Sequence, residues 1–382
     1  MYIKVDKNPR TLMNLSKQNK KISILVFSVR TFYLDILAIR YLEKVEFRYW
    51  FILITMSFLA VTVGRTGILE PYLLGYLSKL NTLKKYLSFT SLSFCATFFI
   101  TYSIFNVSLE MSLQFSLCLS NYLVMDLLRY MAIKLDKSFI LKTEVSLFII
   151  TISSSQFLLV FGDFNLMKIV LIQFVFCPYF YFLMIPKLQI LNYSQDQKQK
   201  LSPVTARGMF ATSIMSAFLG LLNLILLQNF LSANFLVFYK SVDSIVGIVR
   251  SIQRISWSIV IVEPRKKIQK IQRRKLITLL LLVPLGLPIL SDLYEVDSRH
   301  EFLLCSSISI LSQMALIFSR YIIVDRLLER RILPFITTSL GGFILTIPYL
   351  ILFRDGSDIT IYFILNSVGI FLSLLFTGRQ NS

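Results

Sequence analysis

The chain of 382 residues has few of the side chains on which enzyme and metal chemistry depend. Its single histidine, His300, leaves little room for catalysis or metal binding through imidazole. The four cysteines, Cys95, Cys118, Cys177 and Cys305, show neither metal-ligand spacing nor a disulfide pattern, so we interpret them as packing residues. There is no GxxxxGK[ST] motif with which the chain would hydrolyse a nucleotide. These absences predict a protein that uses no cofactor and is not an enzyme.

Acidic residues are also scarce, with 21 Asp and Glu against 40 Lys and Arg, which gives a formal net charge of +19. Such a charge could indicate a nucleic-acid partner. However, 55% of the residues are apolar and the mean hydropathy is +0.68. These values are typical of a membrane protein whose cytoplasmic loops are rich in Lys and Arg, so we expect no nucleic-acid partner.

Apolar runs of about 17–25 residues predict twelve membrane spans. They fall at residues 22–39, 48–69, 87–106, 110–129, 141–161, 165–185, 209–231, 235–262, 276–291, 302–324, 332–353 and 359–378. The first and the ninth are short or interrupted. The expected fold is therefore an all-α polytopic membrane protein. No cleavable signal peptide is expected, because no small-residue cleavage pattern precedes the first run.

Lys and Arg alternate between rich and poor loops, and most of the 40 fall in segments that would be cytoplasmic if both termini are. We therefore predict a protein of the cytoplasmic membrane with both termini in the cytoplasm. All predicted external loops are short. Membrane polymerases and ligases usually place their acceptor chemistry in a long external loop, so the short loops argue against such an enzyme.

A polar segment in mid-chain divides the predicted spans into six and six. The predicted parts are a cytoplasmic tail (1–21), an N-lobe (22–186), a cytoplasmic linker (187–208), a C-lobe (209–378) and a cytoplasmic C-terminus (379–382). In each half the second span ends in Glu-Pro, at Glu70 and at Glu263. This matching position favours two parallel repeats.

The eighth predicted span carries charges that a lipid-facing helix would not. Lys240, Asp243, Gly247, Arg250 and Arg254 follow one another at intervals of three or four residues, so they line one stripe of a helix. Each charge would cost roughly 2.5–3.5 kcal/mol at the centre of a bilayer. We expect the stripe to face a wet, protein-lined interior. Its arginines suit an anionic passenger that carries phosphate.

Other charged residues lie within spans or at their ends. Arg30 and Asp35 lie in the first span, and the spacing of Asp126 and Arg129 in the fourth favours a local ion pair at the helix end. The candidates for gating or helix-end roles are Arg40, Arg65, Glu70 and Glu263. For Arg65, snorkelling to the cytoplasmic surface is the alternative.

Three segments, 37–74, 125–144 and 233–253, together resemble the polysaccharide flippases of the multidrug/oligosaccharidyl-lipid/polysaccharide exporter superfamily. Two glycines that the family often has after the first span are missing here: Glu43 follows Arg40-Tyr41-Leu42, and Arg48 follows Glu46-Phe47. The resemblance implies two six-helix bundles in a V, a central cavity and alternating access. The residues matching cavity positions are Arg30, Asp35, Lys240, Asp243, Arg250 and Arg254.

The leading hypothesis is a flippase for polyprenyl-diphosphate-linked oligosaccharide in surface-polysaccharide synthesis. Its partners would be this lipid-linked oligosaccharide, membrane lipids and a polysaccharide polymerase with its chain-length machinery. The alternative is a cation-coupled drug or metabolite exporter of the same fold. Such a carrier would need more acids than bases in its cavity. The first and the eighth predicted spans together hold four bases and two acids. A membrane glycan polymerase or ligase is the third hypothesis.

Overall fold

The computed structural model describes most of the chain between residues 9 and 379. The described ranges are 9–73, 77–134, 139–162, 164–183, 203–230, 233–262, 287–288, 292, 298–328, 333–353 and 358–379. For 9–21, 251–262, 317–328 and scattered other helical positions, only the backbone is described.

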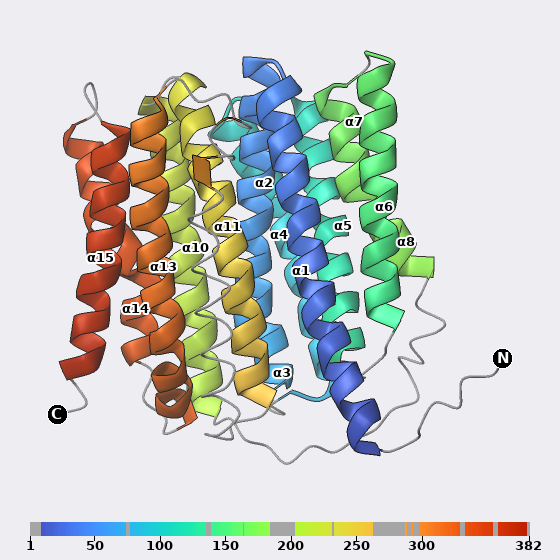
Figure 1. Cartoon of the computed structure of the whole chain (residues 1–382), viewed down its shortest axis with the longest axis vertical. Coiled ribbons are helices and arrows are strands. Elements are labelled where there is room, and N and C mark those ends of the chain that lie inside the picture. Colours follow the sequence, from blue (N-terminus) through green and yellow to red (C-terminus); the bar gives the residue numbers. More distant parts are fainter. Residues whose placement is uncertain are drawn as a thin grey trace.

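All regular structure in the described ranges is helical (Figure 1). The first half contains α1 (Pro9–Tyr41), α2 (Lys44–Gly64), η1 (Arg65–Leu69), α3 (Glu70–Leu73), α4 (Lys79–Ser103), α5 (Leu109–Lys134), α6 (Phe139–Val160), α7 (Leu166–Val170), η2 (Leu171–Phe176) and α8 (Cys177–Leu183). The second half contains α10 (Pro203–Phe230), α11 (Ala233–Val262), α13 (Arg299–Leu328), α14 (Leu333–Leu352) and α15 (Ile359–Arg379). The segments η1 and η2 are π-helical turns that continue their neighbouring helices.

Polar and special residues mark several helix ends. The side chains of Ser78 and Asn165 accept hydrogen bonds from backbone N–H groups in the first turns of α4 and α7, as N-caps do. Pro203 begins α10, a position where its missing N–H costs nothing. Gly162, with φ of +66°, follows α6, and a glycine takes this conformation without strain.

Helices occupy eleven of the twelve predicted spans. The ninth, 276–291, lies outside the described residues except for 287 and 288. Among the described residues, six helical segments are long and apolar enough to cross a membrane: Lys44–Tyr72, Leu109–Met131, Leu141–Val160, Val204–Asn229, Phe335–Leu352 and Ile359–Phe376. The predicted all-α polytopic fold class is confirmed, and the structure is consistent with twelve helices in two bundles.

The two halves of the chain form two groups of helices that lie side by side (Figure 1). They meet where α1 contacts α11 and where α2 contacts α10 and α11. The start of α1 and the end of α15 lie at the same end of the molecule (Figure 1). At the predicted boundaries, α1 begins within the segment expected to be a tail, and α10 begins within the segment expected to be a linker.

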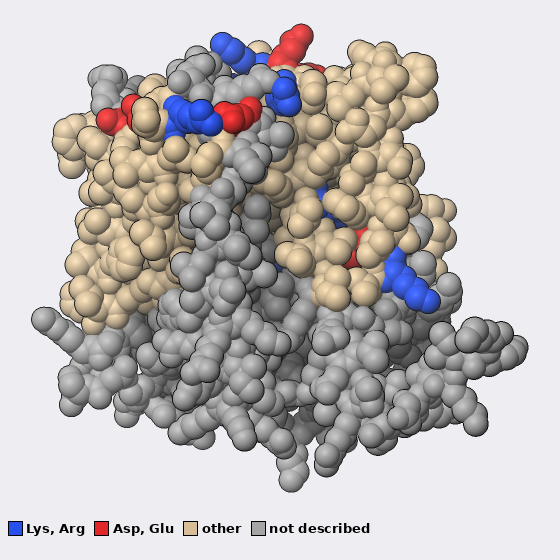
Figure 2. All heavy atoms as spheres, in the orientation of Figure 1, with Lys and Arg blue, Asp and Glu red and all other residues tan. Residues whose placement is uncertain are grey.

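The outer surface of the helices is apolar over a broad band. Large side chains such as Leu92, Phe99, Phe218 and Leu375 are each more than 60% exposed. Figure 2 shows charged side chains gathered along one end of the described surface, with only a few in the band beside it. An apolar surface of this extent needs a covering, and the hydrocarbon of a bilayer would supply it.

Candidate functional site

A cavity of about 430 Å³ lies between the two bundles. Its wall comes from α1, α2, η1 and α3 on one side and from α10, α11, α13, α14 and α15 on the other. The central cavity implied by the family resemblance is therefore present, and helices of both halves enclose it.

Most polar side chains on the cavity wall are uncharged. The hydroxyl and amide side chains are Ser28, Thr31, Thr55, Thr62, Thr66, Ser216, Asn223, Ser244, Gln313, Thr338, Ser339 and Asn366. The aromatic ones are Phe27, Phe32, Phe58, Tyr239, Phe335, Phe343 and Tyr362. The wall therefore offers hydrogen-bond donors and acceptors between aromatic faces.

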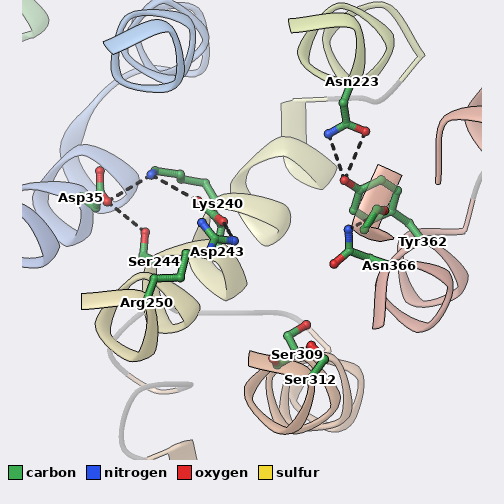
Figure 3. A network of polar contacts seen from close by, with 11 residues as sticks. Asp35, Asn223, Lys240, Asp243, Ser244, Arg250, Ser309, Ser312, Tyr362 and Asn366 are labelled. Atoms are coloured by element: carbon green, nitrogen blue, oxygen red, sulfur yellow. Dashed lines mark hydrogen bonds and ion pairs between the residues drawn. The ribbon is translucent and has the colours of Figure 1, made fainter. Parts of the chain in front are cut away.

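Four charged side chains on the cavity wall form a continuous chain, with one member on α1 and three on α11 (Figure 3). Lys240 Nζ lies 3.1 Å from Asp35 Oδ2 and 3.8 Å from Asp243 Oδ2. Arg250 Nη2 lies 2.8 Å from Asp243 Oδ1. Acid and base alternate along this chain, and the Asp35–Lys240 pair joins the two bundles.

Two further donors hold the carboxylate of Asp35. Ser244 Oγ donates to Oδ2 at 3.1 Å, and Trp50 Nε1 donates to Oδ1 at 3.4 Å. The Asp35 side chain thus accepts hydrogen bonds from its own bundle and from α11. A buried carboxylate needs several such partners to remain charged.

Exposure differs along the charged chain. The side chain of Lys240 is 3% exposed, whereas that of Arg250 is 41% exposed and lines the cavity. Arg250 also uses one side of its guanidinium for Asp243. Of the two described cations on the cavity wall, Arg250 is therefore the one whose side chain has surface accessible to a ligand.

The structure places Lys240, Asp243, Gly247 and Arg250 together on the cavity wall, as the three- and four-residue spacing predicts. The side chain of Arg254 lies outside what the structure describes, and so does Glu263. Asp35 lines the same cavity from α1, opposite the stripe.

The charge balance of the described wall differs from the expected excess of bases. Asp35, Glu70 and Asp243 face two bases, Lys240 and Arg250. The described balance differs from the count of charges within the spans at two residues, and the side chain of Arg254, which the count included, lies outside what the structure describes. Glu70 joins the wall from α3, whereas Arg30 does not lie on it.

Arg30 lies inside the first bundle instead, and it is fully buried. Its Nη1 is 3.7 Å from Oε2 of Glu144 on α6. Arg129 also uses Glu144, with its Nε 3.1 Å from Oε1. The family resemblance placed Arg30 in the cavity, and the structure corrects this. Arg30 faces α6, whereas Asp35, on the same helix α1, faces α11.

Asp126 pairs with Arg65 rather than with its predicted neighbour Arg129. Nε of Arg65 donates to both carboxylate oxygens at 3.0 and 2.9 Å, and Nη2 also contacts Oδ1. Arg65 is only 7% exposed, so it does not reach the surface as the snorkelling alternative supposed. Asp126 and Arg129 share a helix face by spacing, but neighbouring helices supply a better partner for each.

Arg40 and Glu70 were the other candidates for gating or helix-end roles. Arg40 lies exposed at the end of α1, with its guanidinium 5.9 Å from the centre of the Tyr41 ring. Glu70 is buried at the start of α3 and lines the cavity. Glu70 thus lines the same cavity as Asp35.

Sequence reasoning missed a neutral polar group on the C-terminal side of the cavity (Figure 3). Asn223 and Tyr362 exchange hydrogen bonds at 2.9 and 3.2 Å, and Asn366 Nδ2 donates to the Gly342 carbonyl at 3.0 Å. Amide side chains inside otherwise apolar spans are unusual. The asparagines in the predicted spans were therefore the sequence signal that could have identified this polar group. Within the described residues, no group of three or more His, Cys, Asp or Glu could hold a metal ion.

No protein-family model matches the sequence, and no curated protein matches it. Solved structures do share its fold. An outward-facing multidrug resistance MATE family transporter of the MOP superfamily aligns with 98% of this chain and 96% of its own, with a TM-score of 0.58 and 11% identity. The eukaryotic MATE transporter AtDTX14 gives 0.59 and 14%, over 96% of this chain and 95% of its own.

A MOP superfamily transporter from Pyrococcus furiosus also aligns, with a TM-score of 0.59 and 10% identity over 98% of this chain and 96% of its own. Its description states that reverse polarity of the binding pocket suggests a different function. Identities this low show a shared fold alone. Over nearly its whole length, the chain has the fold of MATE transporters of the MOP superfamily.

Proposed function

We propose that the chain is a transporter that moves a lipid-linked glycan, joined to its lipid by a diphosphate, across the cytoplasmic membrane for surface-polysaccharide synthesis. The observation that carries the proposal is the cavity wall of hydroxyl and amide side chains set between aromatic rings. Sugar hydroxyls need many donors and acceptors, and aromatic faces pack against sugar rings. A purely apolar passenger would leave these wall groups unpaired.

The half-exposed Arg250 supplies the second part of the site. Its guanidinium lines the cavity and shares Asp243 with Lys240, and an Arg fork matches phosphate geometry. In Figure 3 the charged chain lies on one side and Asn223 and Tyr362 on the other. A headgroup with a phosphate at one end and sugars at the other would span these two sides.

The size of the cavity limits the headgroup. A volume of about 430 Å³ falls in the usual range of small-molecule sites, roughly 300–1,000 Å³. In this conformation it would hold a short glycan, with the lipid tail remaining in the bilayer. No bond is made or broken in such a step. Moving negative charge outward would gain about 2.3 kcal/mol per elementary charge per 100 mV of membrane potential.

The ion pair between the bundles suggests how binding would act on the fold. Asp35 on α1 competes with any bound phosphate for Lys240 on α11. A phosphate that draws Lys240 away would weaken a contact that joins the bundles, and would so favour their separation. Both termini would be cytoplasmic, and a polymerase with its chain-length machinery would receive the product outside.

The test is flipping of a fluorescent polyprenyl-diphosphate glycan in proteoliposomes that contain the purified chain. We expect Arg250→Ala to slow flipping at least tenfold and Arg250→Lys to retain more activity. Asn223→Ala should raise the glycan concentration needed for half-maximal rate. The exposed Arg299 provides a control, since Arg299→Ala removes a cation that does not line the cavity. Flipping that is undiminished in Arg250→Ala would reject the proposal.

One observation favours a second function, export of an organic cation coupled to an ion gradient. Acids outnumber bases three to two on the described cavity wall. A cationic passenger or coupling ion would be attracted by Asp35, Glu70 and Asp243. Uptake of a fluorescent cation into the same proteoliposomes, driven by a proton or sodium gradient and lost in Glu70→Gln, would support this function over glycan transport.

A further inference from the structure

The part of the cavity wall that α13 contributes contains a buried glutamine with unused hydrogen-bonding groups. Gln313 lines the cavity and is 8% exposed. Its amide forms no hydrogen bond with any residue that the structure describes. A buried amide without a partner is unfavourable, so a ligand that supplies a donor and an acceptor at this place would be stabilised.

A second amide lines the cavity from α15. Asn366 donates one N–H of its side chain to the Gly342 carbonyl at 3.0 Å, and this bond orients the amide (Figure 3). The carbonyl oxygen of the Asn366 side chain accepts no hydrogen bond from the described part of the chain. Two amides on different helices therefore both have hydrogen-bonding groups available to a ligand.

The two amides lie at the same level of the wall. Ser312 and Ser367 place α13 against α15, with their Oγ atoms 3.4 Å apart. Gln313 directly follows the first serine in the chain, and Asn366 directly precedes the second. Both helices run in the same direction, because α14 returns the chain between them (Figure 1). One ligand group could therefore reach both amides.

An apolar side chain follows each amide by about one helical turn. Leu316 comes three residues after Gln313, and Ile370 comes four residues after Asn366. Residues at these intervals share one face of a helix, and both apolar side chains line the cavity. Since α13 and α15 run in the same direction, the two apolar side chains lie on the same side of the two amides. The wall thus combines amide groups with an adjacent aliphatic surface.

We propose that this part of the wall is a subsite for an acetamido group, as carried by an N-acetylated amino sugar. An acetamido group has an N–H donor, a carbonyl acceptor and a methyl group. The N–H and the carbonyl would pair with the amides of Gln313 and Asn366. The methyl group would lie against Leu316 and Ile370, which a sugar hydroxyl in its place would leave uncovered.

Gln313 is thus a specificity-determining residue of the cavity. That the acetamido group arrives on a sugar joined to a diphosphate rests on the proposed function. The pairing of amides with an aliphatic surface does not depend on it.

The test compares two headgroups that differ at one position of the sugar ring. One carries N-acetylglucosamine and the other carries glucose, each joined through a diphosphate to the same short prenyl chain. Isothermal titration calorimetry measures their binding to the full-length protein in detergent. We expect the acetamido headgroup to bind about tenfold more tightly, because it gains hydrogen bonds in a buried site. This comparison needs only the unaltered chain.

Gln313→Met supplies a second measurement, since methionine is also long and unbranched but has no amide. The variant should bring the ratio of the two affinities close to one and leave the affinity for the glucose headgroup nearly unchanged. A purely structural role of Gln313 would weaken both headgroups alike. Gln114→Met makes the same chemical change on α5, away from the residues that line the cavity, and should retain the preference.

Equal affinities of the two headgroups for the unaltered chain would overturn the inference, and so would a preference that persists in Gln313→Met. Flipping assays in proteoliposomes separate these outcomes from a failure of the proposed function. If both headgroups are flipped but are bound equally, the subsite is wrong and transport stands. If the acetamido headgroup is preferred but neither is flipped, the subsite stands and transport is wrong. Binding of neither headgroup overturns both.

Discussion

The contact between α14 and α15 allows a sharp prediction about stability. A methyl group at Gly369 would lie 2.2 Å from the carbonyl oxygen of Gly341, whereas ordinary contacts begin at 3.4 Å. A backbone oxygen has no rotamer by which to escape, so Gly369→Ala must move the two helices apart by roughly 1 Å. Overpacking of this kind costs about 1–3 kcal/mol. A loss of one or two kcal/mol already lowers the folded-to-unfolded ratio by about 5–30-fold.

Gly247→Ala is the matched control for this prediction. A methyl group at Gly247 would meet nothing within 4 Å, and alanine favours a helix interior over glycine by about 0.8–1.0 kcal/mol. The same chemical change should therefore raise stability at Gly247 and lower it at Gly369. Unfolding in detergent, followed by circular dichroism, measures both. The reasoning about close helix contact fails if Gly369→Ala is as stable as the unaltered chain, or if both variants shift in the same direction.

Two further predictions concern contacts between helices. Asp126→Ala should lower the free energy of unfolding by about 3–5 kcal/mol, because it leaves the buried Arg65 without its partner. Adding Arg65→Met should recover most of this loss, and a double variant no more stable than the single one would contradict the pairing. Arg48→Ala removes a 2.8 Å hydrogen bond to the end of α10. Spin labels at Val45 and His300 should then report a longer distance, and an unchanged distance would show that this bond does not hold the bundles together.

The helical architecture could be predicted because apolar run length reports directly on membrane spans. The stripe on α11 could be predicted for a related reason: intervals of three and four residues place Lys240, Asp243 and Arg250 on one face. The partner of that face could not be predicted. Asp35 lies in another bundle, more than 200 positions earlier, and no local pattern connects it with Lys240. Periodicity predicts which residues share one face of a helix, but it does not predict which other helix packs against that face.

Arg30 shows a second limit. Arg30 and Asp35 both lie in the first span, but residues five apart on a helix point about 140° away from each other. One therefore faces Glu144 on α6 and the other faces α11. The five-residue spacing of Arg30 and Asp35 already implied this difference in direction, and a count of the charges within each span does not take direction into account. Glu144 itself gave no signal, because a single acid near the start of an apolar helix is indistinguishable from a surface residue.

The position of Phe27 has an electrical consequence. Phe27 lines the cavity, and its ring also lies against the buried guanidinium groups of Arg30 and Arg129. Charges interact far more strongly when water is excluded. The Phe27 ring therefore helps to keep water away from Arg30 and Arg129. A passenger that displaces this ring would admit water to both cations and weaken their hold on Glu144, so the cavity could communicate with the interior of the first bundle without any movement of a helix.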